Sequence, residues 1–212
     1  DADGLAKIMT RASRVLNTAG PFEKTALPIA RAAIAARIPY VDVNGEVDMF
    51  NALRELDQAA SDAGIALLSG AGYGVAAGDC LALHVANRMK GIVEMRLGLD
   101  TFLRRRSVGA TVSAIMAFHS GGYVIGNAMM VPEPVAKHSW MAGEKGDKRL
   151  FAGVPLAEAW AAWSTTNVPN IRAGIRIGRA MLPFLRLAGV LLKSETIANF
   201  AIRCAEMAGS SE

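Results

Sequence analysis

The sequence has few of the residues that build disulfide frameworks or metal sites. It contains 2 cysteines and 3 histidines among 212 residues. Two isolated cysteines in a chain of this length indicate reduced thiols and a cytoplasmic setting rather than a disulfide-bonded scaffold. The histidines, His84, His119 and His138, lack the spacing of zinc ligands, so we expect no metal site.

Long apolar runs and extended basic clusters are missing as well. The most apolar segment, 181–192, is interrupted by Arg186 and is too short to span a bilayer. The formal net charge is only +4 and aromatic residues make up 6% of the chain, so a nucleic-acid partner is not expected. The arginine cluster at 104–106 is interpreted as a solvated connection, with binding of an acidic substrate group as the alternative.

The start of the sequence carries no signal-peptide pattern and leads almost directly into a strand, so we expect the beginning of the chain to be missing. A composition of 52% hydrophobic and 20% charged residues is typical of a chain with a well-packed core.

Short apolar runs alternate with helical patterns up to residue 68. Strands are predicted at 15–17, 40–43 and 65–68, and helices at 25–37 and 49–63, with Gly64 ending the second helix. Pro28 is tolerable only in the first turn of its helix. This order predicts a parallel α/β sheet, the C-terminal half of a Rossmann-type domain. Asn17, Asp42 and Ser69 should then lie at one edge of the sheet.

The pattern changes near residue 90. Residues 92–100 alternate between apolar and polar side chains, which predicts a half-exposed strand of a mixed or antiparallel sheet. Residues 170–177 alternate in the same way and should belong to that sheet. We therefore expect a partial dinucleotide-binding domain at 1–90, a mixed-sheet substrate or dimerisation domain at 91–178, and C-terminal helices at 179–212.

Further elements are expected within the second half. They are a helix at 107–119 capped by Ser107, a hairpin turning at Gly126-Asn127, a loop at 142–147, a strand at 150–154, a helix starting at Pro155, and tail helices with a break near 193–194.

Polar and conformationally special residues follow the first two strands. Asn17-Thr18-Ala19-Gly20-Pro21-Phe22 comes after the first strand, and Asp42-Val43-Asn44-Gly45-Glu46 ends the second. Ligands collect at the carboxyl ends of parallel strands, and a glycine lets the backbone approach a ligand closely. The alternatives are an ordinary strand-to-helix connection for the first segment, and, for Glu46, a favourable interaction with the dipole of its own helix.

These two segments resemble the saccharopine dehydrogenase-like oxidoreductase family, in which they end neighbouring strands of a nicotinamide-binding domain. Gly72-Tyr73-Gly74 with Asp79 is similar to the family segment at which the chain leaves that domain, although Ala77 stands where proline is usual. The segments 107–111, 154–155 and 164–170 continue the resemblance, which covers roughly residues 10–178. The family's phosphate-binding G-x-G-x-x-G lies upstream, so the N-terminal part of the domain, which separates NAD from NADP, would precede Asp1.

The resemblance implies hydride transfer between NAD or NADP and a small-molecule substrate. It implies cofactor contacts by Asn17, Thr18, Ala19, Gly20, Pro21, Phe22, Asp42, Gly45, Glu46 and Gly72. Tyr73 and Glu46 are the candidates for the catalytic acid or base. The alternative for Tyr73 is a partly buried aromatic ring whose hydroxyl group is hydrogen-bonded. The three loops that follow the strands should converge on one cleft facing the second domain.

Other readings of the sequence remain open. Residues 72–77 fit G-x-G-x-x-A and form a dinucleotide fingerprint in their own right, although Glu94 and Asp100 only partly supply the acidic residue that such a site needs. Asp79 is predicted to be a helix N-cap.

A non-catalytic protein of the same fold is the rival. It would bind lipid, a membrane surface or a protein partner, including a second copy of itself, through 181–192 and the tryptophans Trp160 and Trp163. His119 is interpreted as a helix-end histidine, with acid–base work as the alternative.

Overall fold

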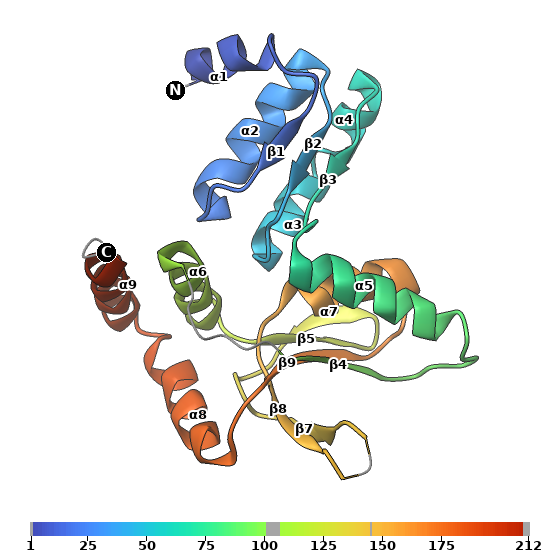
Figure 1. Ribbon diagram of the computed structural model, residues 1–212, viewed down its shortest axis with the longest axis vertical. Coiled ribbons are helices and arrows are strands. Elements are labelled where there is room, and N and C mark those ends of the chain that lie inside the picture. The colour runs from blue at the N-terminus through green and yellow to red at the C-terminus, as the bar shows by residue number, and fades with distance from the viewer. Residues whose placement is uncertain (1, 101–106, 145, 210–212) are drawn as a thin grey trace. The chain divides into compact units, whose positions relative to one another are not determined.

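The computed structural model describes residues 2–100, 107–144 and 146–209, so the arginine cluster at 104–106 lies outside the described residues. The chain divides into two compact units between Ala76 and Ala77 (Figure 1). This division lies inside helix α5 (Tyr73–Ala86), whereas the sequence places its domain boundary beyond the end of that helix. The α/β fold class is confirmed, because a parallel sheet is followed by a separate mixed sheet and by C-terminal helices.

The first unit is a three-stranded parallel sheet with helices between its strands. Its elements are α1 (Ala2–Met9), β1 (Val15–Asn17), α2 (Phe22–Ala36), β2 (Tyr40–Asp42), α3 (Val47–Arg54), α4 (Asp57–Ala63) and β3 (Leu67–Leu68). The strands lie in the order β1-β2-β3, and Asn17 is the register partner of Asp42. The predicted parallel topology, with Asn17, Asp42 and Ser69 at one edge, is therefore confirmed.

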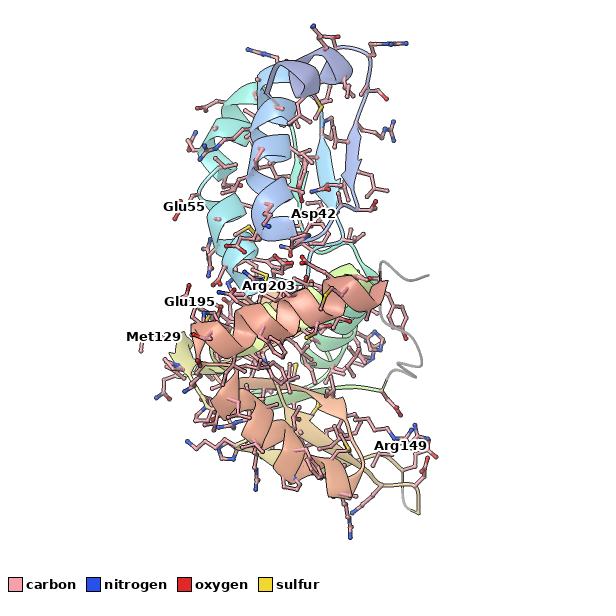
Figure 2. The ribbon with its side chains drawn as sticks, turned by 90° about the vertical axis from the view of Figure 1, so that its left-hand side faces the viewer. Asp42, Glu55, Met129, Arg149, Glu195 and Arg203 are labelled. Atoms are coloured by element: carbon pink, nitrogen blue, oxygen red, sulfur yellow. The ribbon has the colours of Figure 1, made fainter. Side chains whose placement is uncertain are left out.

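Helices cover one face of this sheet (Figure 2). Tyr40 and three alanines of α2, Ala26, Ala30 and Ala33, are fully buried there. Alanines at this spacing form a flat helix face that can lie close to the strands. On the other face Leu16 and Leu68 are 63% and 55% exposed.

Two expectations about the helices of this unit are wrong. Helix α2 begins at Phe22, so Pro28 lies in its interior rather than in its first turn. The exposed ring of Pro28 is tolerated because the buried alanine face on the other side stabilises the helix as a whole. The single helix expected at 49–63 is two helices, α3 and α4, separated at Glu55-Leu56. Gly64 ends α4 in the left-handed conformation, as predicted.

The second unit contains a six-stranded mixed sheet. Besides most of α5, its elements are β4 (Met95–Leu99), α6 (Val108–His119), β5 (Tyr123–Gly126), β6 (Met129–Pro132), β7 (Ser139–Ala142), β8 (Arg149–Gly153), α7 (Ala157–Thr166), β9 (Ile171–Arg176), the 3₁₀ turn η1 (Arg179–Met181), α8 (Leu182–Leu191) and α9 (Glu195–Gly209). The strand order is β6-β5-β9-β8-β7, and β4 pairs with β9 in parallel.

The two alternating segments share one sheet, as predicted. Met95 of β4 and Ile171 and Ala173 of β9 pack against Ala82 of α5 and Ala162 of α7. Helices therefore cover the apolar face of this sheet.

Aromatic rings cover part of the opposite face. Gly98 and Gly174 are register partners on β4 and β9. A Cβ atom on Gly98 would lie 2.7 Å from the Phe151 ring, and one on Gly174 would lie 2.5 Å from the Trp140 ring. The two rings stack with their centroids 6.0 Å apart. Glycine is required at both strand positions, because a side chain at Gly98 would overlap the Phe151 ring and one at Gly174 would overlap the Ala152 backbone oxygen and the Trp140 ring.

Several smaller predictions for this unit are confirmed or shifted. Ser107 caps α6, since its hydroxyl accepts a hydrogen bond from the Ala110 N–H. The hairpin turn is Asn127-Ala128, whose φ angles are 52° and 59°, rather than Gly126-Asn127, because Gly126 pairs with Met129 in the ladder. Helix α7 begins at Ala157 instead of Pro155.

Strand β7 has no counterpart among the predicted elements, and its last residue begins the predicted loop at 142–147. The break between α8 and α9 occurs where expected. None of the helices in the described ranges combines the length and apolar composition of a bilayer-crossing segment.

Candidate functional site

A buried carboxylate organises the carboxyl edge of the first sheet. The Asp42 side chain ends β2 and is fully buried (Figure 2). Its Oδ1 accepts hydrogen bonds from the Asn44 N–H at 3.0 Å, the Ser69 hydroxyl at 2.9 Å and the Gly70 N–H at 2.8 Å. Its Oδ2 accepts one from the Tyr40 hydroxyl at 2.9 Å. A buried charge needs several donors of this kind, and here they come from β2 itself and from the loops after β2 and β3.

Tyr40 connects this carboxylate to the end of β1. The Asn17 Nδ2 donates to the Tyr40 hydroxyl at 3.2 Å and to the Thr25 hydroxyl at 3.3 Å. Burial, with the neighbouring Asp42 carboxylate, raises the pKa of the Tyr40 phenol. The phenol therefore stays protonated at neutral pH and remains a donor to Asp42.

Three Asx turns shape the first two strand-end loops. In each, a side-chain oxygen accepts from the backbone N–H two residues ahead: Asn17 from Ala19 at 3.0 Å, Asp42 from Asn44 at 3.0 Å, and Asn44 from Glu46 at 2.6 Å. Asn and Asp are favoured at such positions because their short side chains reproduce a backbone turn. Asn17 and Asp42 thus act inside the protein, positioning the loops.

Glu46 caps a helix, but not its own. It precedes α3 without a side-chain capping bond there. Its Oε1 instead accepts from the Phe22 N–H at 3.2 Å and its Oε2 from the Glu23 N–H at 2.9 Å, at the start of α2. The carboxylate therefore occupies the position at the N-terminus of α2 where an anion would bind.

The loop after β3 is held against the end of β2. The Ala71 N–H donates to the Asp42 backbone oxygen at 2.7 Å. A Cβ on Gly72 would lie 3.2 Å from the Val43 backbone oxygen, and Gly70 has a φ of +78° with the Phe50 ring against it. Both glycines are thus explained by close packing of the loops, without any ligand.

Residues Thr18, Ala19 and Gly20 form the exposed tip of the first loop. The backbone of Ala19 is fixed by a hydrogen bond, because its carbonyl oxygen accepts from the Thr25 hydroxyl of α2 at 2.6 Å. The Gly20 N–H has no acceptor among the described residues. A Cβ on Gly20 would meet only the Phe22 ring, at 3.8 Å, and one on Gly45 would meet nothing within 4 Å. These two glycines border open space, and the Gly20 N–H is a donor for a ligand.

The remaining predicted residues have different surroundings. Pro21 is half-buried and joined to Gly20 by a cis peptide bond, and Phe22 is a buried core residue. Tyr73 is the first residue of α5 and is 79% exposed, so the interpretation of its ring as a partly buried aromatic is wrong.

The prediction that Asp79 is an N-cap is also wrong, because α5 starts six residues earlier and places Asp79 in its interior. Its Oδ2 accepts from the Thr165 hydroxyl of α7 at 3.0 Å. Near it, Glu158 of α7 is 7% exposed and packs against Gly78, and burial raises the pKa of this carboxyl.

His119 ends α6 as predicted, with its Nδ1 2.9 Å from the Leu192 backbone oxygen. Among the described residues, no three His, Cys, Asp or Glu side chains are grouped to hold a metal ion.

The sequence singled out Asn17, Asp42 and Glu46 as site residues and placed Ser69 at the same edge. It did not predict the hydrogen bonds made to them by four residues, Tyr40, Asn44, Thr25 and Ser69. The sequence pattern does indicate two of these four residues, Tyr40 and Asn44. Tyr40, Asp42 and Asn44 alternate along one strand and its extension, and alternate residues of a strand point to the same face.

Comparison with known proteins identifies a similar fold. No family model matches the sequence, and no curated protein does. Among solved structures, the chain is similar to saccharopine dehydrogenase (L-Glu forming) from Saccharomyces cerevisiae, with a TM-score of 0.56 and 12% identity over 92% of this chain and 47% of that enzyme. A protein from Yersinia pestis whose assignment as an oxidoreductase is itself provisional gives a TM-score of 0.33 and 16% identity over 83% of this chain and 48% of that one. The chain spans about half the length of the solved structures it matches, and it shares the fold of that part of the yeast dehydrogenase.

Proposed function

We propose that this chain carries the nicotinamide-side part of an NAD- or NADP-dependent oxidoreductase that acts on a small-molecule substrate. The observation that supports this most is the buried Asp42 network. It fixes three consecutive loops at the carboxyl edge of a parallel sheet, where cofactors bind in this class of fold. The shared fold with a dehydrogenase and the resemblance of 17–22 and 42–46 to oxidoreductase segments point the same way.

The charges at this edge favour a particular part of the cofactor. Because Glu46 already caps α2, a phosphate at that helix N-terminus would lie beside a carboxylate and be repelled. An uncharged amide or ribose, or the positively charged ring of an oxidised nicotinamide, is not repelled there. We therefore assign Thr18, Ala19, Gly20 and Gly45 to the contacts with nicotinamide and its ribose, and Asn17, Asp42 and Glu46 to the positioning of these loops.

When bound, the nicotinamide supplies or accepts the hydride. The residues of this chain would orient it through the exposed Thr18–Gly20 backbone, whose Gly20 N–H suits a carboxamide or hydroxyl oxygen. Both carboxylate oxygens of Glu46 already accept backbone hydrogen bonds at the start of α2, so this side chain is assigned to positioning the loops. The exposed phenol of Tyr73 is the better of the two candidates for proton transfer.

Nicotinamide fluorescence titration of the full-length protein with NADH and NADPH tests this assignment. Gly20→Val places a side chain where the backbone would meet the cofactor, and it should raise the Kd about tenfold or more. The folded structure should be kept, because the Cβ position lies in ordinary contact with Phe22 only. Gly178→Val is the matched control, since its Cβ meets nothing within 4 Å in the second unit. Equal affinity of wild type and Gly20→Val, or no binding by the wild type, would contradict the proposal.

A further inference from the structure

Helix α8 has two apolar faces, and only one of them is packed. Leu182 and Leu185 contact the small core around Val135, and a Cβ on Gly189 would lie 2.7 Å from the Val135 Cβ, so the helix lies directly on that core. The opposite face is exposed in the described part of the chain. It consists of Met181 (56% exposed), Phe184 (63%), Leu187 (54%), Val190 (66%) and Leu191 (44%). We call these five residues the outer face of α8.

The charged residues of the α8 segment all have the same sign. Between Gly178 and Ser194 the charged residues are Arg179, Arg186 and Lys193, and none is acidic. The Arg186 Nε donates to the Ala136 backbone oxygen at 3.0 Å. Within the described ranges, none of the three forms an ion pair with a carboxylate. Arg186 is thus held on the packed side of α8, whereas the positive charges of Arg179 and Lys193 are available to an anionic partner.

Helix α9 provides a contrast. It also exposes large apolar side chains, Ile197, Phe200 and Met207. Its charges are mixed, however, because Glu195 and Glu206 accompany Arg203 (Figure 2 labels Glu195 and Arg203). Of these two helices, α8 is therefore the one that combines an exposed apolar face with charges of a single sign.

We propose that α8 docks on a membrane surface that contains anionic lipids. The outer face of α8 would enter the boundary between headgroups and acyl chains, and Arg179 and Lys193, just beyond the two helix ends, would lie among the headgroup phosphates. A helix of 10 residues is about 15 Å long, so it can lie in this boundary but cannot cross a bilayer.

Charge also argues against a second copy of the chain as the occupant. In a two-fold symmetric contact the same patch occurs on both sides of the interface. Arg179 and Lys193 of one copy would then face those of the other, with no acidic residue of this segment between them. An anionic lipid surface offers an apolar environment to the outer face of α8 and negative charges to the basic residues. This inference does not depend on the proposed oxidoreductase function.

Co-sedimentation with vesicles tests the inference on the full chain. One set of vesicles contains phosphatidylcholine alone, and in the other phosphatidylglycerol replaces part of it. We expect binding to the second set and little to the first, with weakening at high salt. The double variant Phe184→Ser/Leu187→Ser, and separately Arg179→Gln/Lys193→Gln, should each lower the partition coefficient about tenfold.

Leu81→Ser is the matched control, because Leu81 is 60% exposed on α5 and lies outside the proposed surface. It should bind like the wild type. Circular dichroism confirms folding of each variant, which is expected since the substituted side chains are exposed. Three outcomes would overturn the inference: no binding to anionic vesicles, binding that the α8 variants leave unchanged, or a dimer in size-exclusion chromatography that dissociates in Phe184→Ser/Leu187→Ser.

Discussion

Replacing Asp42 by alanine should strongly destabilise the first unit. The carboxylate is fully buried and accepts hydrogen bonds from the Tyr40 hydroxyl, the Ser69 hydroxyl and the N–H groups of Asn44 and Gly70. The Ser69 hydroxyl is only partly buried and can turn to water, but the other three donors would lose their acceptor inside the protein. At about 1–3 kcal/mol for each of these three unsatisfied buried donors, the free energy of unfolding should fall by about 3–9 kcal/mol.

Asp42→Asn separates the loss of the acceptor from the loss of volume. Its remaining carbonyl oxygen can still accept from Asn44 and Gly70, but its amide group would face the Tyr40 hydroxyl, whose proton then lacks an acceptor. We expect a cost of about 1–3 kcal/mol from that one donor. Tyr40→Phe, added to Asp42→Asn, should recover part of this loss, whereas Tyr40→Phe alone should be destabilising.

Urea unfolding followed by two probes measures these effects. Far-UV circular dichroism reports on both units, while tryptophan fluorescence reports on the second alone, since Trp140, Trp160 and Trp163 all lie there. The Asp42 variants should shift the circular dichroism transition more than the fluorescence transition. A free energy of unfolding for Asp42→Ala within about 1 kcal/mol of the wild type would refute the reasoning, because the buried donors would then have found other partners.

Three further predictions concern other buried groups. Burial raises the pKa of Tyr40 in the folded state, so its contribution to the free energy of unfolding is fully present below the ordinary pKa of about 10. Above that pH the contribution is lost by up to about 1.4 kcal/mol per pH unit. Urea titrations on either side of about pH 10 should show this slope in the wild type but not in Tyr40→Phe. Burial likewise raises the pKa of Glu158, so its contribution to the free energy of unfolding is present below about pH 4.3 and is lost as the pH rises through its pKa in the folded state. The melting temperature of Glu158→Gln relative to that of the wild type should therefore increase from acidic to neutral pH. A difference that stays constant with pH would contradict this. Gly174→Ala places a Cβ against the Ala152 backbone oxygen and 2.5 Å from the Trp140 ring. It should lower the free energy of unfolding by about 1–3 kcal/mol and alter the tryptophan fluorescence, while Gly178→Ala, in open space, should change neither.

Much of the architecture was predictable from local patterns. The apolar runs that end at Asn17, Asp42 and Leu68 predict parallel strands, because helices between them leave little choice of topology. The alternation in 92–100 and 170–177 predicts one shared sheet, since side chains of a strand alternate between its faces. Caps were also readable, as at Ser107 and Gly64, because a cap depends on residues within one turn of the helix end.

The roles of the polar residues were decided by tertiary structure. By itself the sequence determined that Asn17, Asp42 and Glu46 follow strands, and so that they lie at one edge. Only the folded chain decides that Glu46 caps α2 rather than α3, because its acceptors meet N–H groups more than twenty residues away. Only the register of β1 and β2 brings Asn17, Tyr40 and Asp42 into one buried network. Hydrogen bonds between residues that are distant in the sequence depend on how helices and strands pack together. A sequence pattern within one element does not predict that packing.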